Sequence, residues 1–227
     1  ANKSKPKKAT SRKKILDSIT LEEMPASSRK YPYVSFEPER EAGKDILFVE
    51  GITKTVDGVK VLDNVSFIAN KGDKIALVGE NEAGQTALFK ILTGEMEPDA
   101  GSFKWGVSTS QSYFPQDNSA FFEGFDEDLI CWLRQYSEDT TETYLRGFLG
   151  RMLFSGDEVY KPAKVLSGGE KVRCMLSRMM MTHANVLLLD QPTNHLDLES
   201  IQALADGLAR FPGNLLFSCL LYTSDAA

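Results

Sequence analysis

Cysteine is scarce in this chain, which has three, Cys131, Cys174 and Cys219, and none of them is in a paired spacing. The spacing excludes a disulfide framework or a cysteine-bound zinc site and indicates a reducing, cytoplasmic setting. No run of about 18 apolar residues occurs, so we expect no insertion into a membrane. The first 14 residues, ANKSKPKKATSRKK, lack the apolar core of a secretion signal.

Acidic residues are absent from those first 14 residues, which carry seven Lys or Arg in a chain of net charge −6. Clustered cations gain free energy when they release counterions from nucleic-acid phosphates. A solvated tail is the alternative, and composition alone leaves both open. Apolar residues at helical spacing over 15–21 predict a helix, and Pro, Ser and charge over 25–45 predict an extended segment. We therefore expect a basic linker over residues 1–44.

Strand-like and helix-like stretches alternate from residue 45 onward, and this indicates an α/β domain with a parallel core sheet. An early hairpin with a turn at Asp57-Gly58 adds an antiparallel portion. The predicted strands cover 46–52, 61–69, 73–79, 101–106, 108–114, 185–190 and 214–218. The predicted helices cover 84–94, 126–137, 141–154, 168–181 and 197–211.

A glycine-rich loop, GENEAGQT, follows the strand at 73–79 and leads into a helix that we expect to begin near Gly84. It fits the phosphate-binding pattern G-x-x-x-x-G-K-[ST] except that Gln85 replaces the lysine. Backbone N–H groups of residues 80–86 can surround a phosphate at the positive end of that helix. Thr86 stands where a hydroxyl would bind Mg²⁺. The candidate nucleotide-binding positions are Gly79, Glu80, Asn81, Glu82, Ala83, Gly84, Gln85, Thr86 and Ala87.

Two later stretches also suit phosphate chemistry. VLLLDQPTNHLD is an apolar strand that ends in Asp190, which is how a carboxylate is placed beside Mg²⁺. An Asp at the end of a strand is also a common helix cap. In VLSGGEKVR the residues Ser167, Gly168 and Gly169 open a helix, and a helix start binds anions. A plain glycine-rich helix entry is the alternative there, but the three features in this order indicate a nucleotide-binding domain.

Together these residues resemble the ATP-binding cassette family over roughly residues 46–218. GENEAGQT is similar to its Walker A loop, LSGGE to its signature motif, LLLDQP to its Walker B strand and NHLD to its D-loop. Gln116 in SYFPQD matches the family's Q-loop, which touches Mg²⁺ and the attacking water. The resemblance implies a P-loop α/β domain with an antiparallel β portion and a helical subdomain. It implies ATP and Mg²⁺ as cofactors, with Thr86, Gln116 and Asp190 at the metal.

Within that family DQPTNHLDLESIQAL is similar to the ABC-F branch, and the basic helix with SSRKYPYVSF resembles the linker between its two cassettes. The resemblance implies the second cassette of a two-cassette protein without a transmembrane domain, acting on the ribosome, with its linker toward tRNA. Two such cassettes sandwich ATP, so Ser167, Gly168 and Gly169 are expected to contact the γ-phosphate held by the other cassette. Closure on ATP and opening after hydrolysis would then move the linker.

The chain departs from the family pattern at the residues most important for hydrolysis. Gln85 lacks the lysine's charge, and a charge-assisted hydrogen bond contributes ~1.5–3 kcal/mol. The expected catalytic positions are Gln191, Gln116 and Asp190, but Gln191 stands where the family has the glutamate that polarises water. Loss of a general base costs about 10²–10⁴ in rate. Natural substitution and sequencing error both stay open for the two glutamines and for Ala87.

The last nine residues, CLLYTSDAA, show neither helical nor strand pattern, and they back-translate to the adapter of transposon-based sequencing libraries. We expect residues 219–227 to be adapter read-through and the cassette to be truncated after Ser218. Cys219 then stands where the family has a switch histidine. Three functions stay open: an ABC-F ATPase acting on the ribosome, the nucleotide-binding subunit of a transporter, and a regulatory cassette that holds ATP without hydrolysing it.

Overall fold

The computed structural model describes residues 31–79 and 81–220, with the backbone alone for Cys219 and Leu220. These residues belong to one compact unit that starts at Tyr31. The predicted basic block, its helix and residues 221–227 of the predicted read-through lie outside the described residues. The division into linker, cassette and read-through therefore stays a prediction.

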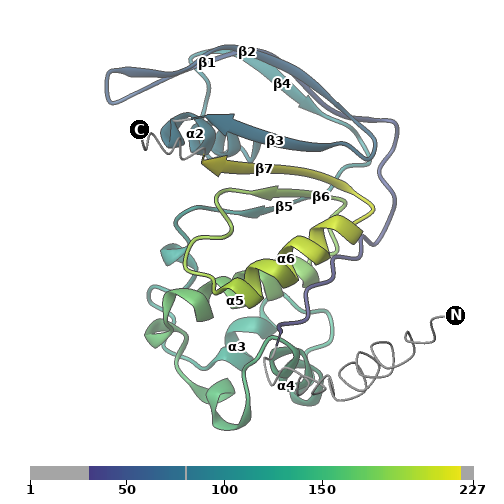
Figure 1. The fold of residues 1–227 in the computed structure, drawn as a ribbon, viewed down its shortest axis with the longest axis vertical. Coiled ribbons are helices and arrows are strands. Elements are labelled where there is room, and N and C mark those ends of the chain that lie inside the picture. The colour runs from purple at the N-terminus through teal and green to yellow at the C-terminus, as the bar shows by residue number, and fades with distance from the viewer. Residues whose placement is uncertain (1–30, 80, 221–227) are drawn as a thin grey trace, which may run out of the picture. The chain divides into compact units, whose positions relative to one another are not determined.

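A four-stranded parallel sheet forms the centre of the domain, in the order β3-β7-β6-β5 (Figure 1). The strands are β3 (Lys74–Gly79), β5 (Gln111–Phe114), β6 (Val186–Leu189) and β7 (Asn214–Leu220). Burial on both faces explains why VLLL reads as one apolar run. β7 continues its pairing with β3 through Cys219 and Leu220, two residues for which the sequence predicted no strand. Pairing with β3 extends β7 by these two residues, and the local sequence pattern does not show this pairing.

A three-stranded antiparallel sheet, in the order β2-β1-β4, covers one side of the domain. Its strands are β1 (Asp45–Val56), β2 (Val59–Asn70) and β4 (Ala100–Trp105). The β1–β2 turn lies at Asp57 and Gly58, as predicted, and both residues have positive φ (49° and 80°). Tight two-residue hairpins require that conformation, and Asp-Gly accommodates it well. The parallel sheet with an antiparallel portion confirms the predicted fold class.

Helix α2 (Glu82–Leu92) lies between the two sheets (Figure 1). Its buried side chains share a core with the antiparallel sheet and with Val186 and Leu188 of β6. The alternate residues of β6, Leu187 and Leu189, belong to a second core on the opposite face. Because side chains alternate along a strand, β6 joins both cores.

The second core is made by the helices on that opposite face, α3 (Leu129–Arg134), α4 (Glu142–Arg151), α5 (Gly168–Met181) and α6 (Leu198–Arg210). In the described part of the chain, three short 3₁₀ turns accompany these helices. The first, η1 (Ser119–Phe121), precedes α3, and the other two, η2 (Gly156–Tyr160) and η3 (Ala163–Val165), lie between α4 and α5. The helix predicted over 168–181 is confirmed, but those predicted over 126–137 and 141–154 are too long. Helix α3 starts later than predicted because Asp128 caps it, with its side chain accepting the N–H of Cys131.

Residues 31–44, the leading segment, contain no helix or strand but pack onto the helices. Tyr33 N–H donates to the carbonyl of Arg151 (2.9 Å), and Val34 and Phe36 are buried in the second core. A Cβ on Gly207 of α6 would lie 2.7 Å from the carbonyl oxygen of Val34. Glycine at position 207 therefore lets the leading segment approach α6 closely.

Candidate nucleotide-binding site

The glycine-rich loop joins the end of β3 to α2, as the strand-loop-helix pattern predicted. The helix begins at Glu82, two residues before the predicted start near Gly84, because Asn81 caps it. The Asn81 Oδ1 accepts the N–H of Gly84 at 3.2 Å. A Cβ on Gly84 would lie 2.6 Å from the Val61 carbonyl, so no other residue fits without a shift. The first turn of a helix, where N–H groups lack acceptors one turn earlier, is a place where anions bind, and we call this helix start the phosphate seat.

Gln85 turns back along the loop from its place in the first turn of α2. Its side chain is buried, and its Nε2 donates to the carbonyl of Gly79 at 3.4 Å. A glutamine can make this bond without a charge, so the seat lacks the cation that a lysine would add. Ala87, the next predicted position, is buried in the core beside α2 and has no polar group to offer.

Thr86 and Asp190, predicted to share a metal, lie in direct contact although 104 residues separate them. The Thr86 hydroxyl donates to Asp190 Oδ2 at 2.6 Å. Gln116, the third predicted metal position, has its Oε1 3.2 Å from the same hydroxyl. The structure therefore brings together Thr86 of α2 and two residues that follow strands, Gln116 after β5 and Asp190 after β6.

Asp190 is fully buried, and Ser218 in the neighbouring strand β7 contacts its other carboxylate oxygen. The Ser218 hydroxyl donates to Asp190 Oδ1 at 2.7 Å. Burial raises the pKa of Asp190 above its ordinary value of 3.8, and the hydroxyls of Thr86 and Ser218 oppose that rise only in part. The carboxylate thus carries a charge that burial penalises and that a cation would stabilise.

Oxygen donors of this kind suit Mg²⁺ when the ion is shared with a nucleotide. In phosphate sites Mg²⁺ takes one or two carboxylates and fills its remaining positions with phosphate and water oxygens. Thr86, Gln116 and Asp190 offer one hydroxyl, one amide oxygen and one carboxylate. Across residues 31–79 and 81–220 no group of three or more His, Cys, Asp or Glu side chains forms a candidate metal cage. The residues present fit a nucleotide-bound ion better than a protein-only site.

Gln191 follows Asp190 in a left-handed conformation (φ 50°) and is only 6% exposed. Its backbone N–H donates to Ser218 Oγ (2.8 Å), and its Oε1 accepts Asn194 Nδ2 (3.0 Å). Its Nε2 has no hydrogen-bond acceptor in the described part of the chain. A buried donor without a partner is unfavourable. The surroundings of position 191 would therefore suit an acceptor-only carboxylate better than this amide.

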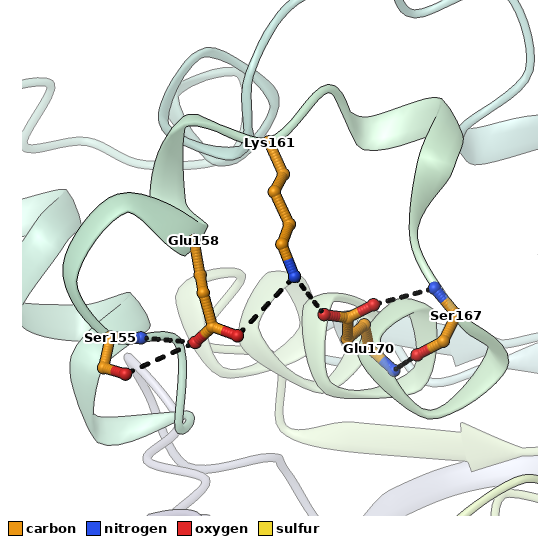
Figure 2. A network of polar contacts seen from close by, with 5 residues as sticks. All are labelled: Ser155, Glu158, Lys161, Ser167 and Glu170. Carbon is orange, nitrogen blue, oxygen red and sulfur yellow. Dashed lines mark hydrogen bonds and ion pairs between the residues drawn. The ribbon is translucent and has the colours of Figure 1, made fainter.

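The helix α5 starts with a capping box formed by Ser167 and Glu170 (Figure 2). The Ser167 Oγ accepts the N–H of Glu170 (3.3 Å), and Glu170 Oε2 accepts the N–H of Ser167 (2.8 Å). Because Ser167 Oγ acts as an acceptor there, its hydroxyl hydrogen can still donate outward. The N–H groups of Gly168 and Gly169 lie in the first turn, where helices lack internal acceptors.

Lys161 joins this capping box to a second one, formed by Ser155 and Glu158 in η2 (Figure 2). Its Nζ lies 3.1 Å from Glu170 Oε1 and 3.5 Å from Glu158 Oε1. Burial opposes the charge of Glu170, but its bonds to Ser167 and Lys161 lower its pKa overall. Sequence reasoning did not single out Lys161, because the contact depends on how the two turns fold.

The capping box gives a stability prediction for the start of α5. Ser167→Ala is expected to lower the free energy of unfolding by about 0.5–2 kcal/mol, because an N-cap acceptor is lost. Ser167→Asn should restore most of it, since Asn also caps. Urea unfolding followed by circular dichroism measures both, and equal stability of Ser167→Ala and the parent chain would contradict the prediction.

Gly168 also meets the loop that follows β6. A Cβ on Gly168 would lie 3.1 Å from His195 Cγ, so the ring packs against the glycine. A cavity of about 200 Å³ opens beside them, and its lining includes Gln116, Lys171, Gln191 and Asn194. The cavity connects the α5 start with the Gln116 loop. Among the described residues no hydrogen bond or ion pair joins Ser167 or Gly169 to the loop at residues 79 and 81–86, and their role across two cassettes remains a prediction.

Ser218 is a residue of the site that sequence reasoning did not assign. It bonds both to Asp190 and to the backbone of Gln191. The available signal was its position, since a polar residue closes the apolar run NLLF just as Asp190 closes VLLL. The carboxyl ends of neighbouring parallel strands meet at one sheet edge, and ligands bind there.

The fold and this site define a nucleotide-binding cassette. The family model described as ABC transporter matches residues 62–194, more than half of the chain, and the chain belongs to this family. The solved structure of cbiO1 from Clostridium perfringens, part of the ABC transporter complex cbiONQ, is similar in fold with a TM-score of 0.58. It is 20% identical, and the match covers 79% of this chain and 80% of that one.

Several curated relatives are more similar in sequence. The uncharacterized ABC transporter ATP-binding protein YkpA of Bacillus subtilis is 67% identical over 96% of this chain and 41% of its own length. The probable ATP-binding protein YbiT of Escherichia coli O157:H7 is 42% identical with the same coverage. The ATP-binding protein Uup of Caulobacter vibrioides is 34% identical over 77% of this chain and 29% of its length. The chain thus spans about two fifths of the first relatives. Within the described residues no helix is long and apolar enough to cross a membrane.

Proposed function

We propose that this chain is one ATP-binding cassette of an ABC-F-type protein that carries two cassettes and acts on the ribosome. The observation that carries the nucleotide site is the 2.6 Å contact between Thr86 and Asp190 beside the start of α2. Relatives named ATP-binding proteins support nucleotide as the ligand. Their greater length leaves room for a second cassette.

The chain's own groups then divide the work of binding. The start of α2 would receive the phosphates on its N–H groups, at the positive end of the helix dipole. Thr86 and Asp190 would hold Mg²⁺, with Gln116 beside them. When bound, Mg²⁺ supplies positive charge that offsets the phosphates and the buried carboxylate. The hydrogen bond from Ser218 to Asp190 Oδ1 holds the carboxylate in one orientation before the ligand binds.

Nucleotide affinity tests this proposal directly. Gln85→Lys is expected to tighten MgATP binding about tenfold to a hundredfold, because a lysine adds a charge-assisted bond worth ~1.5–3 kcal/mol. Calorimetric titration of the purified chain measures the dissociation constant. Thr86→Val serves as the matched control, since it keeps the shape and removes the hydroxyl, and it should weaken binding in Mg²⁺. If the parent chain and Gln85→Lys both fail to bind ATP, the nucleotide proposal is wrong.

A cassette that holds ATP without cleaving it is the second candidate, and Gln191 favours it. An amide cannot take a proton from water, and Asn194 already holds its oxygen. Such a cassette would close on ATP and open slowly, which suits a regulatory half of a two-cassette protein. Measurements of ATP turnover by the full-length protein separate the two candidates.

The ribosomal role is supported by the seven cations of residues 1–14 and by the resemblance to the ABC-F branch. Co-sedimentation with ribosomes should fall steeply between 50 and 200 mM salt, since phosphate contacts release counterions (about 10³–10⁵ in affinity for 6–10 contacts). Deletion of residues 1–14 should weaken ribosome binding and make the affinity less dependent on salt concentration. Recovery of the full-length protein with membranes instead of ribosomes would favour the transporter alternative.

A further inference from the structure

Glu82 places a carboxylate at the start of the helix that forms the proposed phosphate seat. It is the first residue of α2 and is exposed to solvent. Its Oε2 accepts a hydrogen bond from Gln116 Nε2 at 3.2 Å. Gln116 in turn has its Oε1 3.2 Å from the Thr86 hydroxyl. A continuous chain of polar contacts therefore runs from Glu82 through Gln116 and Thr86 to Asp190.

The loop that forms this seat carries negative charge only. The only charged residues in the loop over 79–86 are Glu80 and Glu82, and the loop has no Lys or Arg. Asp190 adds a buried carboxylate at the far end of the contact chain. Glu82 and Asp190 are close enough for the charge of Glu82 to raise the pKa of Asp190, which Lys90 opposes. Phosphate oxygens that enter the seat would meet carboxylates instead of a loop lysine.

An acidic residue in a first helical turn often only stabilises the helix dipole. Two observations connect Glu82 to the ligand as well. Its carboxylate occupies the same positive helix end that a phosphate would need, and its bond to Gln116 holds a predicted metal position. Stabilisation of the helix dipole does not require this contact with Gln116, which lies in the loop after β5.

We propose that Glu82 determines which form of the nucleotide this cassette accepts, by making binding depend on a divalent cation. Metal-free ATP brings its full negative charge to the carboxylates of the seat, whereas the magnesium complex brings less charge. Glu82 also keeps Gln116 beside Thr86 through its hydrogen bond. This inference rests on the proposed nucleotide-binding function.

The experiment compares ATP affinity in Mg²⁺ with ATP affinity in EDTA for the parent chain and for Glu82→Gln. Glutamine keeps an oxygen that can accept from Gln116 but removes the charge. We expect metal-free ATP to bind about tenfold more tightly to Glu82→Gln, as one unit charge a few ångströms away implies. MgATP should gain much less, so the ratio of the two dissociation constants falls. Glu97→Gln, an exposed carboxylate just beyond α2, is the matched control and should leave the ratio unchanged.

The possible results distinguish the proposed role of Glu82 from the proposed nucleotide-binding function. If the parent chain binds MgATP and Glu82→Gln has the same ratio of dissociation constants for metal-free ATP and MgATP, the proposed role of Glu82 is wrong. The nucleotide-binding proposal then still stands. If the ratio changes equally in Glu97→Gln, the proposed role of Glu82 is also wrong, because the loss of any nearby negative charge would then produce the effect. No ATP binding by the parent chain and by Gln85→Lys overturns both proposals. A circular dichroism melt of each variant confirms that it is folded.

Discussion

Gln191→Glu combined with Gln85→Lys is expected to raise ATP turnover by about 10²–10⁴-fold, because a positioned general base contributes that much. Position 191 is ready for a carboxylate in the structure. Its backbone is bonded to Ser218, Asn194 can donate to the side-chain oxygen, and the buried Nε2 has no acceptor among the described residues. Exchange of the amide nitrogen for oxygen removes that unpaired donor and adds the missing base.

Gln191→Glu without the lysine should make the nucleotide-free cassette less stable. Asp190 is already buried with a raised pKa, and a second carboxylate next to it adds repulsion between like charges. A group whose folded pKa is raised contributes stability below its unfolded pKa and loses it as pH rises through the folded pKa. The parent cassette should therefore lose the part of its stability due to Asp190 as pH rises above 3.8. The Gln191→Glu single variant should lose more, and Mg²⁺ should restore stability in both.

Phosphate release by the full-length two-cassette protein, with the variants placed in this cassette, measures the expected gain. Gln191→Ala with Gln85→Lys is the control, because it binds nucleotide equally but has no base. A rate for the Glu variant equal to that of the Ala variant would mean that position 191 does not set turnover. The regulatory interpretation would then rest on some other feature of the cassette.

The sequence predicted those parts of the fold in which local chemistry and burial agree. The helix over 168–181 has a Ser-x-x-Glu capping box at its start and was predicted with its observed bounds. The meeting of Thr86 with Asp190 followed from two strand-end motifs, since parallel strands bring their carboxyl ends together. The family resemblance and the structure agree on the fold through these same residues.

Other parts could not be predicted because they depend on contacts between distant segments. The leading segment was predicted as an extended part of the linker, and its pattern did not indicate that Val34 and Phe36 are buried against helices more than 100 residues further on. The role of Lys161 depends on two capping boxes that face each other only after folding. The bond between Glu82 and Gln116 likewise joins two loops whose separate sequences give no sign of it.

Trp132→Ala is expected to destabilise the protein by about 3–5 kcal/mol, the cost of deleting a large aromatic from a packed core. Trp132 is fully buried in α3. Its ring stacks on Phe122 (centroids 4.9 Å apart) and meets Tyr136 edge-on (5.0 Å). Its Nε1 donates to the carbonyl of Phe121 at 2.7 Å. One side chain therefore joins η1, α3 and the turn after α3 in the second core.

Urea unfolding measures this loss, and Trp132→Phe is the matched control because it keeps an aromatic ring and should cost less. A loss below about 1 kcal/mol for Trp132→Ala, the size of an average substitution, would contradict the prediction. Trp105 is then the chain's one remaining tryptophan, and it packs against the other core. Its fluorescence should change at the same urea concentration as the circular dichroism. The two cores should unfold together because they share β6. Leu187 and Leu189 of this strand lie in one core, and Val186 and Leu188 lie in the other. Loss of the helical core would then expose one face of the strand that positions Asp190.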